Sequence, residues 1–364
     1  MIRYLLLFVI ILTCPNECHS LSRRKIIKTL LRTPDQELDV LFCDQEWEKQ
    51  FDYATILKVD SLYVMYYRAI NSLNKPSTAY CYATSNDGIH WVKPKLNVFS
   101  FAESQQNNII SDRMDGVSVE YAHGYFWMLA DRFYDEQNKV VRGLILYRSK
   151  DGIHFEKDER LRVPFFCDSQ NEIMWDETSK TFKLYLRSWY KSYVPSIEYH
   201  HSHHLYRSVS LLETPSLDYQ LNYGSKPLFL AGRDEPPSVN NELPVVLKNN
   251  SSSSDFDIYC AYVHKYRANL YIAYPINYYH TDDKKRGGKA DNDGYGTIGF
   301  WVGKNGRVFK EVKRDYITNG EKWMESCVGH IETDSTFIHY YIPFNNTHSG
   351  RPVKNVIRAR IHFK

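Results

Sequence analysis

Five acidic residues occupy corresponding places in the sequence, each a short distance before an aromatic-rich, β-branched segment of the kind that forms strands. They are Asp52, Asp115, Asp168, Asp257 and Glu325. Carboxyl groups that are brought together repel one another when ionised, so some keep a proton while others stay charged. This division supplies an acid and a base to one site, which is what hydrolysis of a glycosidic bond requires. The alternative for each residue taken alone is a turn or capping acid.

Two of these acids lie in clusters that are unusually polar for an inner strand. Arg113-Met-Asp115 places a guanidinium near a carboxylate, and Asp168-Ser-Gln-Asn-Glu172 carries two acids and two amides. Side chains alternate along a strand, so Asp168, Gln170 and Glu172 would share one face. The sequence therefore predicts a functional role for Asp115 and Asp168. The residues that we expect to contact a substrate are Arg113, Gln170, Asn171, Asp257 and Glu325.

The segments that follow the five acids predict how the acids are positioned. Each is a short strand of similar composition; they are Tyr63–Arg68, Tyr125–Ala130, Phe182–Arg187, Tyr271–Pro275 and Phe337–Tyr341. Segments built from strands that recur in this way along the chain indicate one sheet per repeat. A ring of sheets with about four antiparallel strands each is a β-propeller. We therefore predict an all-β, five-bladed β-propeller whose inner strands bring the acids to one end of a central channel.

A second repeat supports this fold. The segment Tyr82–Trp91 recurs as Tyr147–Phe155, and worn copies begin at Tyr206 and Trp301. In each clear copy Asp-Gly supplies the positive-φ turn of a hairpin, and an aromatic residue starts the return strand. This repeat indicates a fold and carries no chemistry.

Composition and the termini limit the class of protein. The net charge of +3 is near neutral, which argues against nucleic acid or an anionic membrane as a partner. The apolar segment Tyr4–Leu12 is too short to span a bilayer and suits a signal peptide cleaved after Ser20, with a retained anchor or a lipoprotein cysteine at Cys14 as alternatives. We expect a signal peptide at 1–20, an irregular lead-in at 21–37 with one candidate helix at 23–31, and a propeller at 38–364. The mature protein is then secreted, monomeric and free of membrane contact.

Neither a metal site nor a cofactor is predicted. The five cysteines that follow the leader are an odd number and show no Cys-x-x-Cys spacing, so they predict neither a disulfide framework nor a metal centre. His264, His330 and His339 lie near predicted inner strands, where we expect structural roles. The closing segment Val353–Phe363 alternates like a strand and is expected to pair with N-terminal residues, latching the ring shut.

Several motifs together resemble secreted five-bladed propeller proteins of the glycoside hydrolase family 32 and family 43 superfamily, in particular the branch described as family-32-like N-terminal domain proteins. The matching segments are Tyr82–Pro94, Asn107–Ile109, Asp115–Ser118, Asp168–Asn171, Trp175–Asp176, Tyr185–Arg187 and Asn292–Gly294. The resemblance runs from about residue 38 to residue 350 and implies a carbohydrate-active site at the channel mouth. It also implies that Asp52 is the nucleophile or base, Asp115 the transition-state-stabilising acid, and Asp168 or Glu172 the general acid. The invertase-type Asn-Asp-Pro-Asn motif is absent, and Arg-Met-Asp-Gly stands where that family has Arg-Asp-Pro.

Three hypotheses follow for the function. The first is an extracellular glycoside hydrolase acting on an oligo- or polysaccharide at a carboxylate-lined pocket. The second is a catalytically inactive propeller that binds glycan or protein, which the missing motifs favour. The third is a propeller enzyme of another kind, such as a metal-dependent lyase or a phosphorylase, for which neither a metal-ligand set nor a basic phosphate pocket is visible in the sequence.

Overall fold

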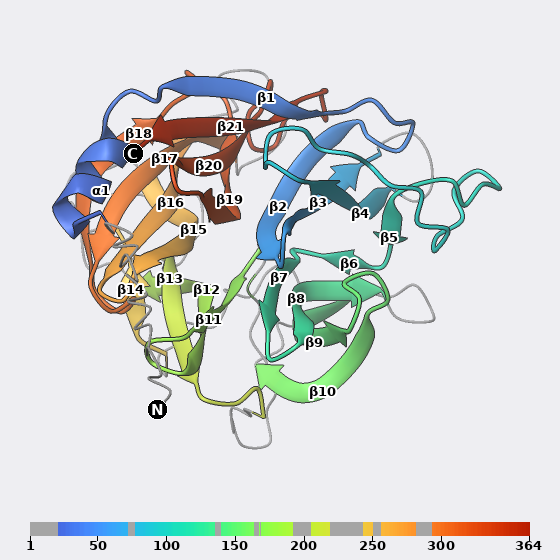
Figure 1. The fold of residues 1–364 in the computed structure, drawn as a ribbon, viewed down its shortest axis with the longest axis horizontal. Helices are drawn as coiled ribbons and strands as arrows, with labels where there is room; N and C mark the ends of the chain where they lie inside the picture. The colour runs from blue at the N-terminus through green and yellow to red at the C-terminus, as the bar shows by residue number, and fades with distance from the viewer. Residues whose placement is uncertain are drawn as a thin grey trace, which may run out of the picture.

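The strands form four curled sheets around a common centre (Figure 1). The computed structural model describes residues 21–71, 77–134, 140–163, 167, 169–191, 205–218, 243–249, 256–281 and 293–364. The described part of the chain contains one helix and is otherwise all-β, as the sequence predicted. The expected signal peptide and the candidate acid Asp168 lie outside the described residues.

The four sheets differ in size. The largest has eight strands, in the spatial order β1 (Gln36–Phe42), β21 (Val356–Phe363), β20 (Thr336–Pro343), β19 (Met324–Glu332), β2 (Gln50–Val59), β3 (Leu62–Ile70), β4 (Thr78–Ser85) and β5 (Ile109–Ser111). The next has five: β10 (Glu156–Val163), β9 (Val140–Ser149), β8 (Tyr125–Tyr134) and β6 (Met114–Asp115), with β7 (Ser118–Ala122) also paired to β8. The third has β11 (Glu172–Asp176), β12 (Thr181–Lys191), β13 (Leu205–Thr214) and β14 (Val245–Leu247), and the fourth has β15 (Phe256–Arg267), β16 (Leu270–Thr281), β17 (Asp293–Gly303) and β18 (Phe309–Ile317).

The inner strands β2, β7, β11, β15 and β19 surround the centre (Figure 1). Each pairs in antiparallel fashion with one of the five aromatic strands predicted from the sequence, which are β3, β8, β12, β16 and β20. Neighbouring inner strands contact one another around the centre: β19 contacts β2, β2 contacts β7, β7 contacts β11, and β15 contacts β19. The eight-stranded sheet holds both the first and the last repeat, and these meet at the single parallel pair Val328–Thr55.

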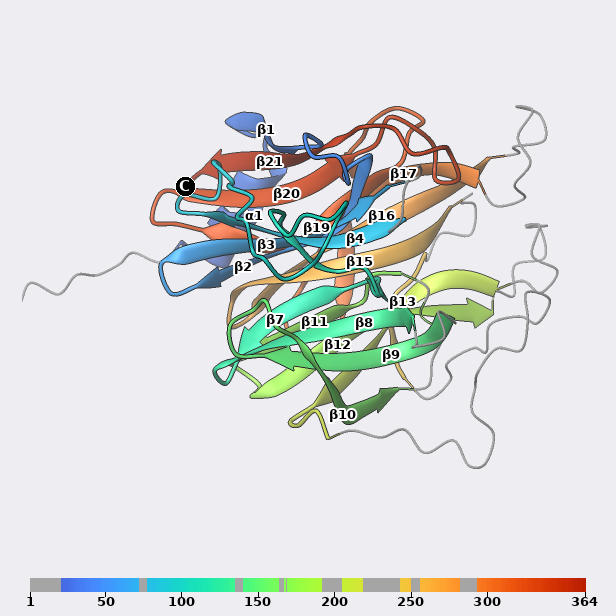
Figure 2. The same ribbon diagram turned by 90° about the vertical axis from the view of Figure 1, so that its right-hand side faces the viewer.

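The two ends of the described chain lie together on the outside of this sheet. β1 pairs with β21 in antiparallel register from Gln36–Ile361 to Phe42–Val356, which confirms the predicted latch (Figure 2). Before it, α1 (Arg23–Leu31) occupies much of the expected lead-in and coincides with the candidate helix of the sequence. The Ser22 side chain caps its first turn, and its buried face packs into the apolar core beside β21.

The repeated Asp-Gly segments form nearly identical turns. Ser85 Oγ accepts from the Gly88 amide at 2.9 Å, and Asp87 Oδ1 accepts from the Ile89 and His90 amides at 2.8 Å each. The second copy repeats these bonds, with Ser149 accepting from Gly152 at 3.0 Å. The worn copy predicted at Tyr206 is wrong, because the strand does not end after Ser208 as it does in the clear copies: β13 continues to Thr214. The copy that begins at Trp301 does make a turn, at Asn305 and Gly306.

These turns also join neighbouring repeats. A buried tyrosine hydroxyl on the second strand of one repeat donates to the turn glycine carbonyl of the next: Tyr340 to Gly88 at 2.6 Å, Tyr66 to Gly152 at 2.8 Å and Tyr185 to Gly306 at 2.9 Å. The three glycines have φ values of +77°, +75° and +73°, a region that side chains disfavour. A Cβ at any of them would also lie within 2.8 Å of the same hydroxyl oxygen. The tyrosine hydroxyl therefore fits only against a glycine, and the glycine carbonyl in the turn is bonded by that hydroxyl.

Gly152→Ala is expected to lower the free energy of unfolding by about 2–4 kcal/mol, since left-handed strain and overpacking add. Gly124→Ala is the matched control, because Gly124 has φ +72° but no atom within 4 Å of the position that a Cβ would occupy, so only the backbone cost of about 1–2 kcal/mol applies. The Gly152→Ala, Tyr66→Phe double variant should lose less than the sum of the two single variants, because the phenol oxygen that clashes is gone. Urea unfolding of wild type and the four variants, with Tyr66→Phe among them, measures this, and equal losses at Gly124 and Gly152 would contradict the role of the contact.

Candidate active site

One guanidinium joins the carboxylates of the first two repeats. Arg68 on β3 donates from Nε to Asp52 Oδ1 at 2.5 Å and from Nη2 to Asp52 Oδ2, while its Nη1 donates to Asp115 Oδ1. The three side chains are 12%, 6% and 8% exposed. Burial lowers the pKa of Arg68, but Asp115 and Asp52 outweigh this effect and raise it well above its usual value. Asp52 and Asp115 are therefore brought together by a cation that stays charged.

The backbone turns sharply after each of these two acids. Tyr53 has φ +47° and Gly116 has φ +58°, and each directly follows its aspartate. The pairing of β2 with β3 shifts register between Asp52 and Thr55, which is a β-bulge. At the second site the strand is interrupted between β6 and β7, and the Gly116 amide donates to Asp115 Oδ1 at 2.8 Å. A β-bulge changes the direction in which a side chain points. The bulge at Asp52 and the interruption after Asp115 each leave the aspartate pointing at Arg68.

Glu325 on β19 completes this acidic group from the last repeat. Its Oε2 accepts from the Tyr53 amide at 3.1 Å, and its Oε1 accepts from Trp323 Nε1 at 2.9 Å. Burial, with the charge of Asp52 as the next cause, raises the pKa of Glu325 to about 8. A carboxyl group with a raised pKa and a carboxylate paired with Arg68 therefore lie on the two sides of Tyr53.

An aromatic wall flanks Glu325 on the side of the fourth repeat. Tyr259, Tyr278 and Trp323 pack edge to face, with ring centroids 4.8–5.8 Å apart. His348 lies against all three, and its Nε2 is 3.0 Å from the Tyr259 hydroxyl. The Arg187 guanidinium stacks 3.9 Å from the Tyr259 ring centroid. The three rings are 8%, 0% and 2% exposed, so the wall is a packed support behind Glu325.

Asp257 lies at the start of β15 in an ion pair of its own. Its Oδ2 accepts from the Arg207 amide at 3.1 Å and from Arg207 Nη1 at 3.2 Å, and it lies 3.5 Å from His280 Nε2. Burial alone would raise the pKa of Asp257, but Arg207 and His280 hold it well below its usual value. The Arg207 guanidinium also lies 5.0 Å from the Tyr278 ring centroid, which ties this pair to the aromatic wall.

The polar residues of the third repeat bind neighbouring backbones. Gln170 reaches from its Nε2 to the Val117 carbonyl at 2.6 Å and to Thr55 Oγ1 at 3.3 Å, so its amide connects three repeats near the centre. Asn171 Oδ1 accepts from the Arg187 amide at 2.7 Å. Both amides are 1% exposed.

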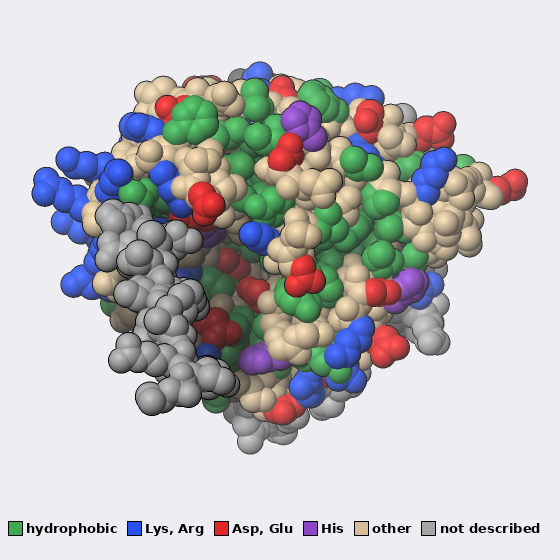
Figure 3. All heavy atoms as spheres, viewed as in Figure 1, with side chains coloured by type: hydrophobic (Ala, Val, Ile, Leu, Met, Phe, Trp, Pro, Cys, Tyr) green, Lys and Arg blue, Asp and Glu red, His purple; other side chains and the backbone are tan. Residues whose placement is uncertain are grey.

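Glu172 lies in a different group of acids, farther along the inner strands. Its Oε2 accepts from the Val263 amide at 2.6 Å, and burial followed by the neighbouring Glu120 raises its pKa well above the usual value. Glu120 in turn accepts from the Trp175 and Tyr121 amides at 3.1 and 2.9 Å, and burial raises its pKa to about 7. Figure 3 shows the face hollowed near its centre, with acidic side chains inside the hollow.

The predicted site residues therefore fall into separate places. Asp52, Asp115 and Glu325 meet around Arg68 and Tyr53, and Asp257 stands across the aromatic wall. Arg113 is exposed, and the guanidinium that the structure shows on Asp115 is that of Arg68. Sequence reasoning missed the arginines. Their signal was present, because Arg68 and Arg187 end two of the five repeated strands.

The described residues hold no group of three or more His, Cys, Asp or Glu side chains arranged to bind a metal ion. The five cysteines among the described residues are buried free thiols. His264, His330 and His339 pack against one another and against tyrosine rings, and burial lowers the pKa of His330 to about 4. Within the part of the chain that is described, no helix has the length and apolarity of a membrane span.

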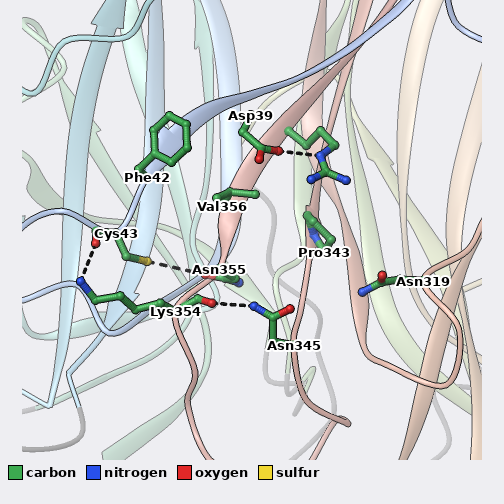
Figure 4. A pocket seen from close by; sticks show the side chains of 10 residues that line it. Asp39, Phe42, Cys43, Asn319, Pro343, Asn345, Lys354, Asn355 and Val356 are labelled. Atoms are coloured by element: carbon green, nitrogen blue, oxygen red, sulfur yellow. Dashed lines mark hydrogen bonds and ion pairs between the residues drawn. The ribbon is translucent and has the colours of Figure 1, made fainter.

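Two pockets elsewhere contain none of the predicted site residues. One of about 390 Å³ lies between β1 and β21, where Arg358 Nε donates to Asp39 Oδ1 at 2.6 Å and Lys354 Nζ donates to the Cys43 carbonyl at 2.9 Å (Figure 4). The other, of about 310 Å³, includes Tyr125 and Trp127. The polar groups named in the first pocket are thus already bonded to the protein.

Arg68→Gln is expected to lower the free energy of unfolding by about 3–5 kcal/mol, because two buried carboxylates lose the cation that they share. Adding Asp115→Asn should restore part of the loss, since one of the repelling charges is removed. Arg358→Gln is the control: it breaks an ion pair whose partners are 34% and 35% exposed and should cost under about 1 kcal/mol. Denaturant unfolding measures these changes in free energy. Similar losses for Arg68→Gln and Arg358→Gln would contradict the central role of Arg68.

No family model matches the sequence, and no curated protein matches it significantly. Solved structures do share its fold. One described as a glycoside hydrolase is 13% identical with a TM-score of 0.55, and the match covers 93% of this chain and 94% of that one. A structure described as a BT0996 RGII complex is 12% identical with a TM-score of 0.54, covering 93% and 95%. An N-acetylgalactosamine deacetylase from F. plautii, in complex with blood group B trisaccharide, is 12% identical with a TM-score of 0.53, covering 91% and 94%. The chain therefore has the fold of glycoside hydrolase-like propeller proteins.

Proposed function

We propose that the chain is a five-bladed β-propeller and an extracellular, monomeric glycoside hydrolase that cleaves an oligo- or polysaccharide at the site around Arg68. The eight-stranded sheet counts as two blades in this proposal, because its two halves are antiparallel sheets that meet at one parallel pair. The latch of β1 on β21 then gives the last blade four strands, β19, β20, β21 and β1. Secretion rests on the apolar leader of the sequence.

The observation that carries the proposal is the meeting of Asp52, Asp115 and Glu325 beside an aromatic wall. Three buried carboxyl groups from three inner segments converge, and one of them has a raised pKa while Arg68 keeps cationic charge next to the other two. Acids whose environments push their ionisation apart are what glycosidic cleavage uses. The rings of Tyr259 and Trp323 are 8% and 2% exposed and pack on each other, so they support Glu325 from behind.

The catalytic roles that we propose for the acids are those implied by the resemblance to the family 32 and family 43 glycoside hydrolases. Asp52 acts as the nucleophile or base, and Asp115 stabilises the charge that develops on the sugar ring in the transition state. For the general acid we favour Asp168 over Glu172, because Glu172 accepts from the backbone of β15 and neighbours Glu120 rather than Asp52. Arg68 holds the two aspartates in place between turnovers.

One observation favours the second hypothesis, an inactive propeller that binds glycan. Arg68 occupies both carboxylate oxygens of Asp52, and a nucleophile held in this way on both atoms must first be released. In the hydrolase, substrate binding has to draw Arg68 away from at least one oxygen. In the binding protein, the same bidentate pair is a permanent structural tie.

Hydrolysis by the secreted full chain across a broad panel of glycans and aryl glycosides tests the proposal. We expect turnover of at least one substrate, and Asp115→Asn should lower kcat by about 10²–10³-fold, because a preorganised charge is lost from the transition state. Asp39→Asn, which alters an exposed pair on β1, is the control and should leave kcat unchanged. Calorimetric binding of a glycan with no turnover in any variant would favour the inactive propeller.

A further inference from the structure

Tyr53 is held in an unfavourable backbone conformation by a carboxyl group from the far end of the chain. Its φ of +47° is in the left-handed region, which costs a residue with a side chain about 1–2 kcal/mol. The register shift between Asp52 and Thr55 takes the Tyr53 amide out of the ladder with β3. Glu325 Oε2 accepts from that amide at 3.1 Å, so the bulge is closed by a side chain of β19 rather than by the sheet.

Glu325 is itself fixed from its other side. Trp323 Nε1 donates to Oε1 at 2.9 Å, and the Trp323 ring is 2% exposed within the wall formed with Tyr259, Tyr278 and His348. Asp52 is the residue directly before Tyr53, so any change in the Tyr53 peptide re-aims the Asp52 carboxylate. A change in the direction of the Asp52 carboxylate also affects Arg68, because the Arg68 guanidinium pairs with Asp52 and stacks 4.6 Å from the Tyr53 ring centroid.

We propose that Glu325 is a positioning residue of this site: by closing the bulge at Tyr53 it sets the direction of the Asp52 carboxylate, and its proton makes that setting depend on pH. The inference rests on the proposed function only in that Asp52 is taken to react with substrate. Protonated Glu325 is a neutral acid beside the Asp52–Arg68 ion pair. Loss of that proton places a negative charge next to the Asp52 carboxylate, and the repulsion turns this carboxylate away from Glu325, while the Tyr53 and Trp323 N–H groups bond more strongly to the ionised Glu325 and keep the bulge closed.

The groups that face Glu325 come from four strands, β2, β3, β15 and its own strand β19. On β2 and β3 they are Asp52, Tyr53 and Arg68. On β15 they are Tyr262 and Cys260, and on its own strand the neighbour is Cys327. Burial raises the pKa of Cys260 to about 12 and those of Tyr262 and Cys327 well above their usual values, so these three stay neutral at physiological pH. Near pH 8 the titration at this place therefore belongs to Glu325, with Asp52 and Arg68 as its charged neighbours.

The sign of the stability effect follows from the raised pKa. The unfolded chain releases the Glu325 proton near pH 4.5, whereas the folded chain keeps it until about pH 8. The stabilisation from this group is complete below pH 4.5 and is lost as the pH rises to about 8. Glu325→Gln cannot titrate, so wild type should lose stability relative to this variant between pH 5 and pH 8.

The experiment measures unfolding midpoints and kcat/KM from pH 5 to pH 9.5 for wild type, Glu325→Gln, Glu325→Ala and Glu120→Gln. Glu120→Gln is the matched control, because Glu120 also accepts from two N–H groups and has a raised pKa but neighbours Glu172 instead of Asp52. We expect an alkaline limb near pH 8 in kcat/KM that Glu120→Gln keeps and Glu325→Gln lacks. Glu325→Ala should lower kcat by about 10²-fold at every pH, with little change in KM, because Asp52 is misplaced.

The stability measurement tests the inference without any turnover. Adding Asp52→Asn should make the loss of stability end at a pH below 8, because the charge that helps to raise the pKa of Glu325 is removed. A difference between wild type and Glu325→Gln that stays constant from pH 5 to pH 9.5 would overturn the proposal, whether or not the protein hydrolyses glycans. An unchanged alkaline limb in Glu325→Gln would overturn it as well. Absence of turnover with the expected pH-dependent stability would instead count against the hydrolase and leave the coupling of Glu325 to Asp52 standing.

Discussion

The charge of Arg68 is the constraint on which the centre of this protein depends. Asp52 and Asp115 come from different sheets, and each would be costly to bury next to the other without a cation between them. The residue that follows Asp52, Tyr53, has a left-handed backbone, so one of the two ion pairs stands directly beside a strained residue. The same ion pairs therefore hold two sheets together and orient Asp52 and Asp115, so a change that weakens them lowers the stability of the protein and alters the geometry of the candidate site.

Away from the centre the sheets are joined by a different device. Buried tyrosine hydroxyls bond to the carbonyls of turn glycines in the next repeat, at Tyr340, Tyr66 and Tyr185. Each such bond contributes about 1 kcal/mol, and its geometry demands a glycine with positive φ. The repeated Asp-Gly segments are thus explained by contact between sheets as much as by the turn that they make.

The sequence was sufficient for the strands and insufficient for the site. Alternating aromatic residues and Asp-Gly turns have a local cause, so the five repeated strands and the latch of β1 on β21 could be predicted. The copy assigned at Tyr206 failed, because two residues that match a motif do not make a turn inside a long strand such as β13. The partner of Asp115 could not be predicted either: Arg113 is near in sequence, but Arg68 reaches Asp115 only because β3 and β6 belong to neighbouring repeats. Asp168 lies outside the described residues, so its role stays a prediction.

The latch has a mechanical consequence. In the antiparallel pair of β1 and β21, Gln36 lies opposite Ile361, so both free ends leave the sheet at the same end of the pair. A force that separates the two ends of the chain then loads one pair of residues at a time, like a zipper, instead of shearing all of them together. Once α1 has been pulled from the core, the load falls on the bonds that close this end, where Asp35 accepts from the Phe363 amide at 2.7 Å and Arg32 donates to the Phe363 carbonyl at 2.6 Å. The pair of strands that closes the ring therefore separates residue by residue when the two ends of the chain are pulled apart.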